Sequence, residues 1–90
     1  MDDFDSFLNE QLQDPEFKKE WDASQLEFDI TEMIIAARRE QNLSQKELAA
    51  KSGIRQSNIS RIENGQCVPN ITTLQRIAAG LGKKVQIQFI

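Results

Sequence analysis

The chain has 90 residues, of which 28% are charged and 39% are hydrophobic, and its formal net charge is −3. No apolar run approaches the roughly 18 residues of a membrane-spanning helix, and the first residues lack the pattern of a signal peptide. The single cysteine excludes an internal disulfide bond, and the absence of histidine argues against a metal site or histidine-based catalysis. We therefore expect a cytoplasmic, non-enzymatic protein with no cofactor and no membrane contact.

The charge is divided unevenly along the chain. Residues 1–30 contain ten acidic residues and two lysines, a net charge of −8, whereas residues 31–90 contain nine basic and four acidic residues, a net charge of +5. A basic domain is suited to a nucleic acid, but an acidic segment is repelled by phosphate. The two parts therefore need separate explanations.

The acidic part also holds five of the six aromatic residues of the chain, all within the first 28 positions. Apolar side chains recur there at helical spacing, and Asp14 followed by Pro15 suits the start of a second helix. Leu26 and Phe28 are predicted to lead into a short connector. The stripe is expected to anchor a basic partner protein, and the alternative is that it docks on the chain's own core. The stripe consists of Phe4, Phe7, Leu8, Leu12, Phe17 and Trp21.

Capping residues mark the helix boundaries that follow. Asp29 is predicted to cap a helix over residues 30–41, which Asn42 can end in the left-handed conformation. Ser44 and Glu47 have the spacing of a capping box at the start of the next helix. The inward face of the first of these helices comprises Ile30, either Met33 or Ile34, and Ala37.

Residues 43–65 predict two short helices, over 45–52 and 56–64, joined by a tight turn. Ala49 is small where two crossing helices must approach closely, and Gly53 can take the positive φ that the turn requires. The space under the corner is filled by Leu48, Ile54, Ile59 and Ile62.

The second of these helices presents an outer face without acidic residues. Glutamine can pair with adenine, and arginine with guanine, in the major groove of DNA. A solvated helix face would more usually mix glutamate and lysine. The pattern therefore indicates a helix that reads base edges. Its outer face consists of Gln56, Ser57, Ser60, Arg61 and Asn64.

A loop and a last helix follow. Cys67 is predicted to be half-buried in the loop, and Asn70 to cap a helix over residues 71–81. Gly80 lies inside the last turn of this helix and is expected to weaken it by up to about 1 kcal/mol relative to alanine. The inner face of the helix consists of Leu74, Ile77, Ala78 and Leu81.

Residues 84–90 change from helical spacing to strict alternation, which predicts a strand with Val85, Ile87 and Phe89 on its buried face. A strand without a neighbour leaves its backbone amides and carbonyls unpaired, and the pattern predicts no second strand in the chain. We expect this strand to pair antiparallel with the same strand of a second copy. Addition to a partner's sheet is the alternative.

Residues 43–65 resemble the helix-turn-helix of the lambdoid-repressor, or Xre-type, family, from Gln45 at the start to the closing Ile-Glu-Asn-Gly. The layout of nearly the whole chain is similar to that of HigA-type antitoxins. This resemblance implies an all-α, lambda-repressor-like helix-turn-helix bundle. It divides the chain into an acidic helical extension for toxin binding (1–28), an Xre-type domain (29–83) and a C-terminal strand that pairs across a dimer (84–90).

The same resemblance implies a homodimer that binds double-stranded operator DNA and represses its own operon. It also implies a toxin partner, a small basic HigB-type, RelE-like messenger-RNA endonuclease, which would explain the acidic extension. One alternative is a stand-alone Xre-type repressor without a toxin partner. Another is a protein-binding module in which the helix-turn-helix is only a scaffold, and the acid-free outer face weighs against it.

Individual roles follow from matching positions. Arg38 and Glu63 match a pair that braces the first core helix against the recognition helix, and the alternative is two independent surface charges. Arg55 stands where the family more often has a small capping residue. It is placed with the base-reading residues, with phosphate contact as the alternative. The other base-reading positions are Gln56, Ser57 and Arg61, and those that match or adjoin phosphate-contacting positions are Gln45, Asn58, Asn64 and Gln66.

Overall fold

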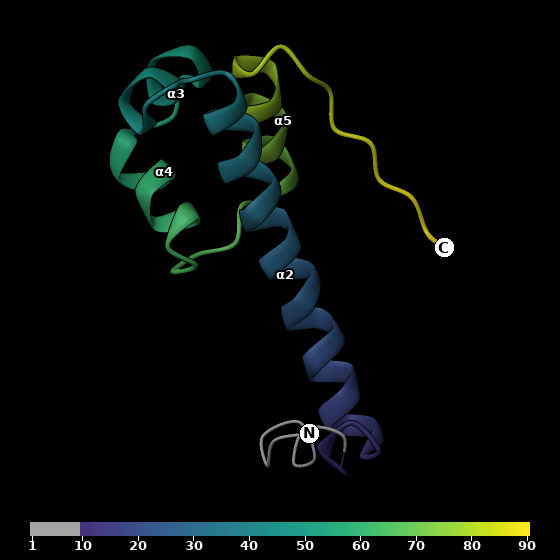
Figure 1. The fold of residues 1–90 in the computed structure, drawn as a ribbon. Helices are drawn as coiled ribbons and strands as arrows, with labels where there is room; N and C mark the ends of the chain where they lie inside the picture. The colour runs from purple at the N-terminus through teal and green to yellow at the C-terminus, as the bar shows by residue number, and fades with distance from the viewer. Residues whose placement is uncertain (1–9) are drawn as a thin grey trace.

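The computed structural model describes residues 10–90, which fold into helices without a β-strand among them (Figure 1). Three of the helices form a compact bundle with one end of the longest, and this confirms the all-α helix-turn-helix fold. The expected anchors Phe4, Phe7 and Leu8 lie outside the described residues. No helix in the described part is both long and apolar enough to span a membrane. The helices are α2 (Pro15–Glu40), α3 (Gln45–Ser52), α4 (Gln56–Glu63) and α5 (Ile71–Gly80).

Helix α2 starts where Asp14 and Pro15 predict. The Asp14 side chain accepts a hydrogen bond from the Glu16 amide at 3.0 Å, and Pro15 occupies the first turn. The helix then continues for 26 residues, so the predicted connector near residue 28 and the cap at Asp29 are wrong. No glycine or proline interrupts the run, and the Asp29 carboxylate instead accepts a hydrogen bond from Gln25, one turn earlier, at 3.2 Å.

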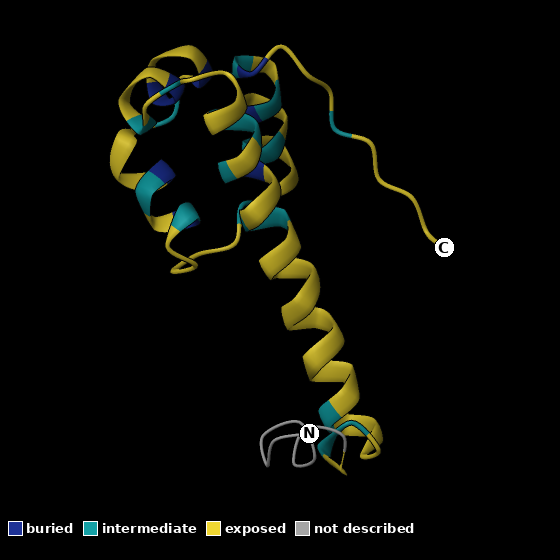
Figure 2. Cartoon of the chain, viewed as in Figure 1, coloured by how far each residue is buried: buried dark blue, intermediate teal, exposed yellow. Residues whose placement is uncertain are grey.

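The first half of α2 projects from the bundle into solvent, whereas its second half packs against α4 (Figures 1 and 2). Ile34 is the buried residue of this helix, at 3% exposure, while Met33 is 57% exposed. Of the two alternatives for the inward stripe, the structure therefore selects Ile34. The helix ends at Glu40 with Gln41 as its C-cap, and Asn42 adopts the expected left-handed conformation with φ 57°.

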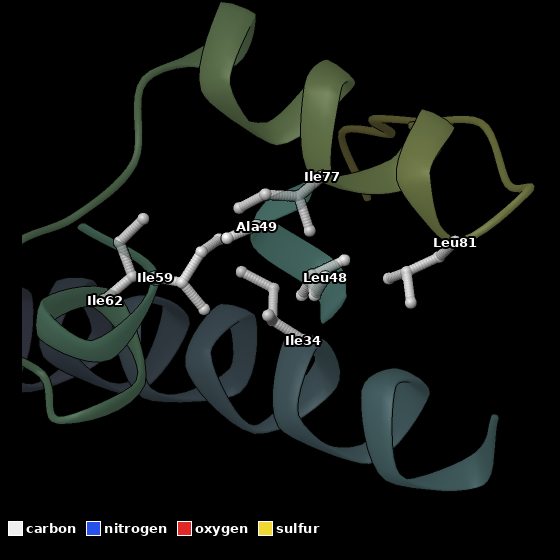
Figure 3. Close-up of a cluster of buried hydrophobic side chains, with 7 residues drawn as sticks. All are labelled: Ile34, Leu48, Ala49, Ile59, Ile62, Ile77 and Leu81. Carbon is white, nitrogen blue, oxygen red and sulfur yellow. The ribbon is translucent and has the colours of Figure 1, made fainter. Parts of the chain in front are cut away.

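The hydrophobic core lies where α2, α3, α4 and α5 meet (Figure 3). Helix α3 is central because it packs against both α4 and α5. The predicted inward residues of each helix contribute, and Ile30, Ile54 and Leu74 pack at the edge. The core is formed by Ile34, Leu48, Ala49, Ile59, Ile62, Ile77 and Leu81.

Local signals define the turn between α3 and α4. Ser44 and Glu47 form both hydrogen bonds of the capping box, each at 3.0 Å, and Gly53 has φ 71°. The hydrogen bonds that the Glu47 carboxylate accepts from Ser44 lower the pKa of Glu47. The stabilisation that follows from this shift is present at neutral pH and is lost as the pH falls through the lowered pKa.

Gly80 has a packing role that its sequence position does not reveal. A Cβ atom at this position would lie 3.1 Å from the Ser52 amide nitrogen and 3.2 Å from the Ser52 Cα and the Lys51 carbonyl carbon. The missing side chain therefore lets α5 approach the end of α3.

Replacing Gly80 with alanine is expected to destabilise the fold by about 1 kcal/mol. The gain in helix propensity, about 1 kcal/mol, is outweighed by a crowding cost of about 1–3 kcal/mol against backbone that cannot rotate away. Urea unfolding of Gly80→Ala measures the balance. A variant more stable than the wild type would show that the close approach has no energetic importance.

Residues 83–90 form no strand and leave the bundle as an extended segment (Figure 1). The strand expected over 84–90 is therefore not formed in this chain, because no strand in residues 10–90 offers it backbone partners. Phe89 and Ile87 are 99% and 65% exposed. Cys67 is exposed rather than half-buried, since the loop that carries it lies on the surface.

Candidate nucleic-acid interface

Helix α4 presents its polar side chains to solvent because its apolar residues hold it against the core. Ile59 and Ile62 are 0% and 2% exposed. Of the side chains on α4, only Glu63 is hydrogen-bonded among the described residues. The polar groups on the outer face are thus available to base edges. Ser60 is half-buried, and the exposed members of the predicted face are Gln56, Ser57, Arg61 and Asn64.

Arg55 precedes α4 as its N-cap and makes no side-chain capping hydrogen bond. This agrees with its departure from the small capping residue of the resembled family, because an arginine side chain has no acceptor for the helix amides. The exposed guanidinium is instead free to contact a ligand beside the turn.

A charged network fixes the far end of α4. The Arg38 Nε and Nη2 atoms donate to the two carboxylate oxygens of Glu63 at 2.8 and 2.9 Å, and its Nη1 donates to the Leu43 carbonyl at 2.8 Å. The two side chains are only 12% and 5% exposed. The hydrogen bonds to Glu63 raise the pKa of Arg38. The predicted brace between α2 and α4 is confirmed, and the alternative of independent surface charges is wrong.

Gln45 belongs to the same network. Its Nε2 atom donates to Glu63 at 3.2 Å, and the side chain is half-buried. The network therefore joins the start of α3 to the ends of α2 and α4. Phosphate contact by Gln45 stays a prediction.

The other predicted phosphate contacts flank the outer face of α4. Asn58 is exposed near its first turn, while Asn64 is the C-cap and Gln66 follows in the loop. The amide of Gln66 donates to the Arg61 carbonyl at 2.9 Å, which holds this loop against the helix end. These three side chains are exposed, and their contact with phosphate stays a prediction.

Two members of the predicted partner-binding stripe, Phe17 and Trp21, lie on the projecting half of α2. The rings of Phe17 and Trp21 stack with centroids 6.3 Å apart, and Trp21 is 38% exposed. Phe28 is 57% exposed and lies seven residues after Trp21, so it extends the same helix face. The spacing of Trp21 and Phe28 could have added Phe28 to the predicted stripe if the helix had been recognised as continuous. Leu12 is half-buried.

Replacing Gln56 with alanine is expected to cost about 1–3 kcal/mol of operator affinity and to relax the preference at one base pair. Gln75→Ala on the exposed side of α5 is the matched control and should change neither. Competition among duplexes with single substitutions measures the preference. A Gln56→Ala protein with an unchanged preference at every base pair would remove this residue from the reading face.

This braced helix, with its acid-free outer face and turn geometry, defines a helix-turn-helix DNA-binding domain. The chain belongs to the helix-turn-helix family HTH_3, which matches residues 34–88. An uncharacterized HTH-type transcriptional regulator from Haemophilus influenzae is 39% identical over 64 residues, 71% of this chain and 65% of that protein.

Two further relatives concern toxin–antitoxin systems. The antitoxin HigA1 of Mycobacterium tuberculosis is 31% identical over 87 residues, 96% of this chain and 58% of that protein. A chain of a toxin–antitoxin module from Streptococcus pneumoniae superimposes with a TM-score of 0.65 at 34% identity, over 81% of this chain and 80% of that chain. The chain is thus a DNA-binding helix-turn-helix protein with antitoxin homologues, and it spans less than two thirds of the curated relatives' length.

Proposed function

We propose that the chain is an antitoxin that represses its own operon and neutralises a small basic toxin of the HigB or RelE type, a messenger-RNA endonuclease. In this proposal helix α4 reads the operator through Gln56, Ser57 and Arg61, and its N-cap Arg55 contacts a base or a phosphate. The projecting half of α2 binds the toxin. In this proposal the division into residues 1–28, 29–83 and 84–90 is one of function, because α2 crosses the first boundary without a break.

The observation that carries the toxin-binding half of the proposal is the projecting part of α2. Trp21 and Phe28 are 38% and 57% exposed on one face of this helix, although each is large and apolar. The surrounding residues are mainly acidic, so this surface suits a basic protein that can cover the aromatic face. Neither residue joins the core cluster, which argues against docking on the chain's own core.

The dimer is part of the same proposal. Val85 is half-buried, whereas Ile87 and Phe89 are exposed, and a second copy that pairs with residues 84–90 would cover them and satisfy their backbone groups. A two-fold dimer can place two α4 helices in successive major grooves, about 34 Å apart. Sedimentation of the chain without residues 85–90 tests this, because an intact dimer would refute the strand pairing.

A stand-alone regulator is the second candidate, and the Haemophilus influenzae relative described as a transcriptional regulator favours it. In that case the acidic extension, residues 1–28, would have no toxin to bind. The two candidates share DNA binding through α4 and differ in the role of residues 15–28.

Co-expression with the protein encoded beside its gene tests the toxin-binding role. We expect that neighbour to be small and basic, to arrest growth alone, and to co-purify with this chain. A chain without residues 1–27 should still bind operator DNA but should no longer restore growth. Restored growth with the shortened chain would show that residues 1–27 do not inhibit the toxin. A neighbouring protein that does not arrest growth would favour the stand-alone regulator.

A further inference from the structure

An open groove of about 430 Å³ lies beside the helix-turn-helix, between the α3–α4 turn, the loop after α4 and α5. Arg55 and Asn58 line it from the turn and α4, while Arg76 lines it from α5. Arg76 lies outside the segment to which sequence patterns assign DNA contacts. The groove therefore brings a third element of the fold to the edge of the candidate interface.

The charge of this groove has one sign. Arg55 and Arg76 are its only charged lining residues, and no acidic side chain borders it. Among the described residues the ion pair joins Arg38 to Glu63, and neither groove arginine pairs with a described carboxylate. The groove on the other side of the loop differs, because Glu27 of α2 lines it.

The groove also lies at the edge where a DNA backbone would pass. Asn58 borders both the groove and the outer face of α4, next to Ser57 and one helical turn before Arg61. A duplex whose major groove receives the outer face of α4 has a sugar–phosphate strand along each flank of that helix. The strand on the Asn58 flank is the one that faces the two arginines.

We propose that this groove holds a backbone phosphate of bound DNA, with Arg76 as a phosphate contact outside the helix-turn-helix. The inference rests on DNA binding by α4. The side chain of Asn70, which also lines the groove, already accepts a hydrogen bond from the Thr73 amide at 2.8 Å. The positive charge at the site therefore comes from Arg55 and Arg76, and Arg55 takes the phosphate-contact role rather than base reading.

The salt dependence of binding tests this assignment in the full chain. The probes are a duplex that the wild-type chain selects from a random-sequence pool and a shuffled duplex of the same composition. Each neutralised phosphate contributes about 0.9 to the slope of log affinity against log salt concentration. Arg76→Ala should lower the magnitude of the slope by about 0.9 and should reduce the affinity for both duplexes by the same factor. Arg76→Lys should restore the slope.

Lys83→Ala is the matched control, because it removes the same charge beyond the end of α5, where Lys83 lines a separate groove. Its slope should stay close to that of the wild type. Thermal unfolding by circular dichroism confirms that each variant is folded. If the slope for Arg76→Ala equals that for Lys83→Ala, the phosphate site is overturned. DNA binding by α4 is still upheld in that case if the wild type prefers the selected duplex over the shuffled one. A wild-type chain that selects no duplex overturns both.

Discussion

Replacing Trp21 with alanine is expected to weaken binding of the proposed toxin partner by about 2–4 kcal/mol, or roughly 30- to 700-fold, and to leave operator binding unchanged. Trp21 stacks on Phe17 and is 38% exposed on a helix that projects from the bundle. A partner can therefore bury the indole without competing with the core. Aromatic anchors of this kind contribute a large share of interface energy because they bring much apolar area with few rotatable bonds.

Leu26→Ala is the matched control for this experiment. Leu26 is even more exposed, at 62%, but lies on a different face of α2 from Trp21 and Phe28. Titration calorimetry with the purified toxin should give a much smaller loss for Leu26→Ala than for Trp21→Ala. Equal losses would mean that the aromatic face is not the contact surface, and no loss in either would place the toxin elsewhere.

Arg38→Ala is expected to destabilise the fold by about 3 kcal/mol. The carboxylate of Glu63 is 5% exposed and would lose both charged hydrogen bonds, so it would remain buried with only the Gln45 amide as a side-chain donor. Removal of one member of a buried pair costs about 3–5 kcal/mol. We take the lower end because Arg38 retains some exposure. Loss of these hydrogen bonds also frees the end of α4, so the affinity for operator DNA should fall.

Urea unfolding measures this effect, and Arg39→Ala provides the control. Arg39 is the exposed neighbour of Arg38 in the last turn of α2, and its loss should cost about 0.5 kcal/mol through the helix dipole. The double variant Arg38→Met, Glu63→Leu should recover most of the lost stability, since no charge is then left unpaired. Equal destabilisation by Arg38→Ala and Arg39→Ala would contradict the bracing role.

The bundle helices could be predicted because their boundaries depend on local signals. Ser44 with Glu47, Gly53 and Asn70 each satisfy backbone groups within a few residues, so spacing alone identifies them. The extent of α2 could not be predicted in this way. An aspartate such as Asp29 caps a helix only where the backbone before it is non-helical, and nothing in residues 15–28 breaks the helix.

The candidate site shows the same division. The exposed face of α4 follows from the period of Ile59 and Ile62, and the structure bears out its exposure. The hydrogen bond from Gln45 to Glu63 and the close approach at Gly80 depend on how separate helices meet. Sequence spacing contains no information about such contacts. Arg76 belongs to this second class, because only the fold brings α5 beside the turn.

The central claim is that α4 reads a specific duplex, and footprinting on the DNA upstream of its own gene tests it most directly. We expect the wild-type chain to protect one site with two related half-sites about one helical turn apart, and Gln56→Ala to weaken the protection. Absence of any protected site at chain concentrations up to those at which nonspecific binding begins would contradict the account.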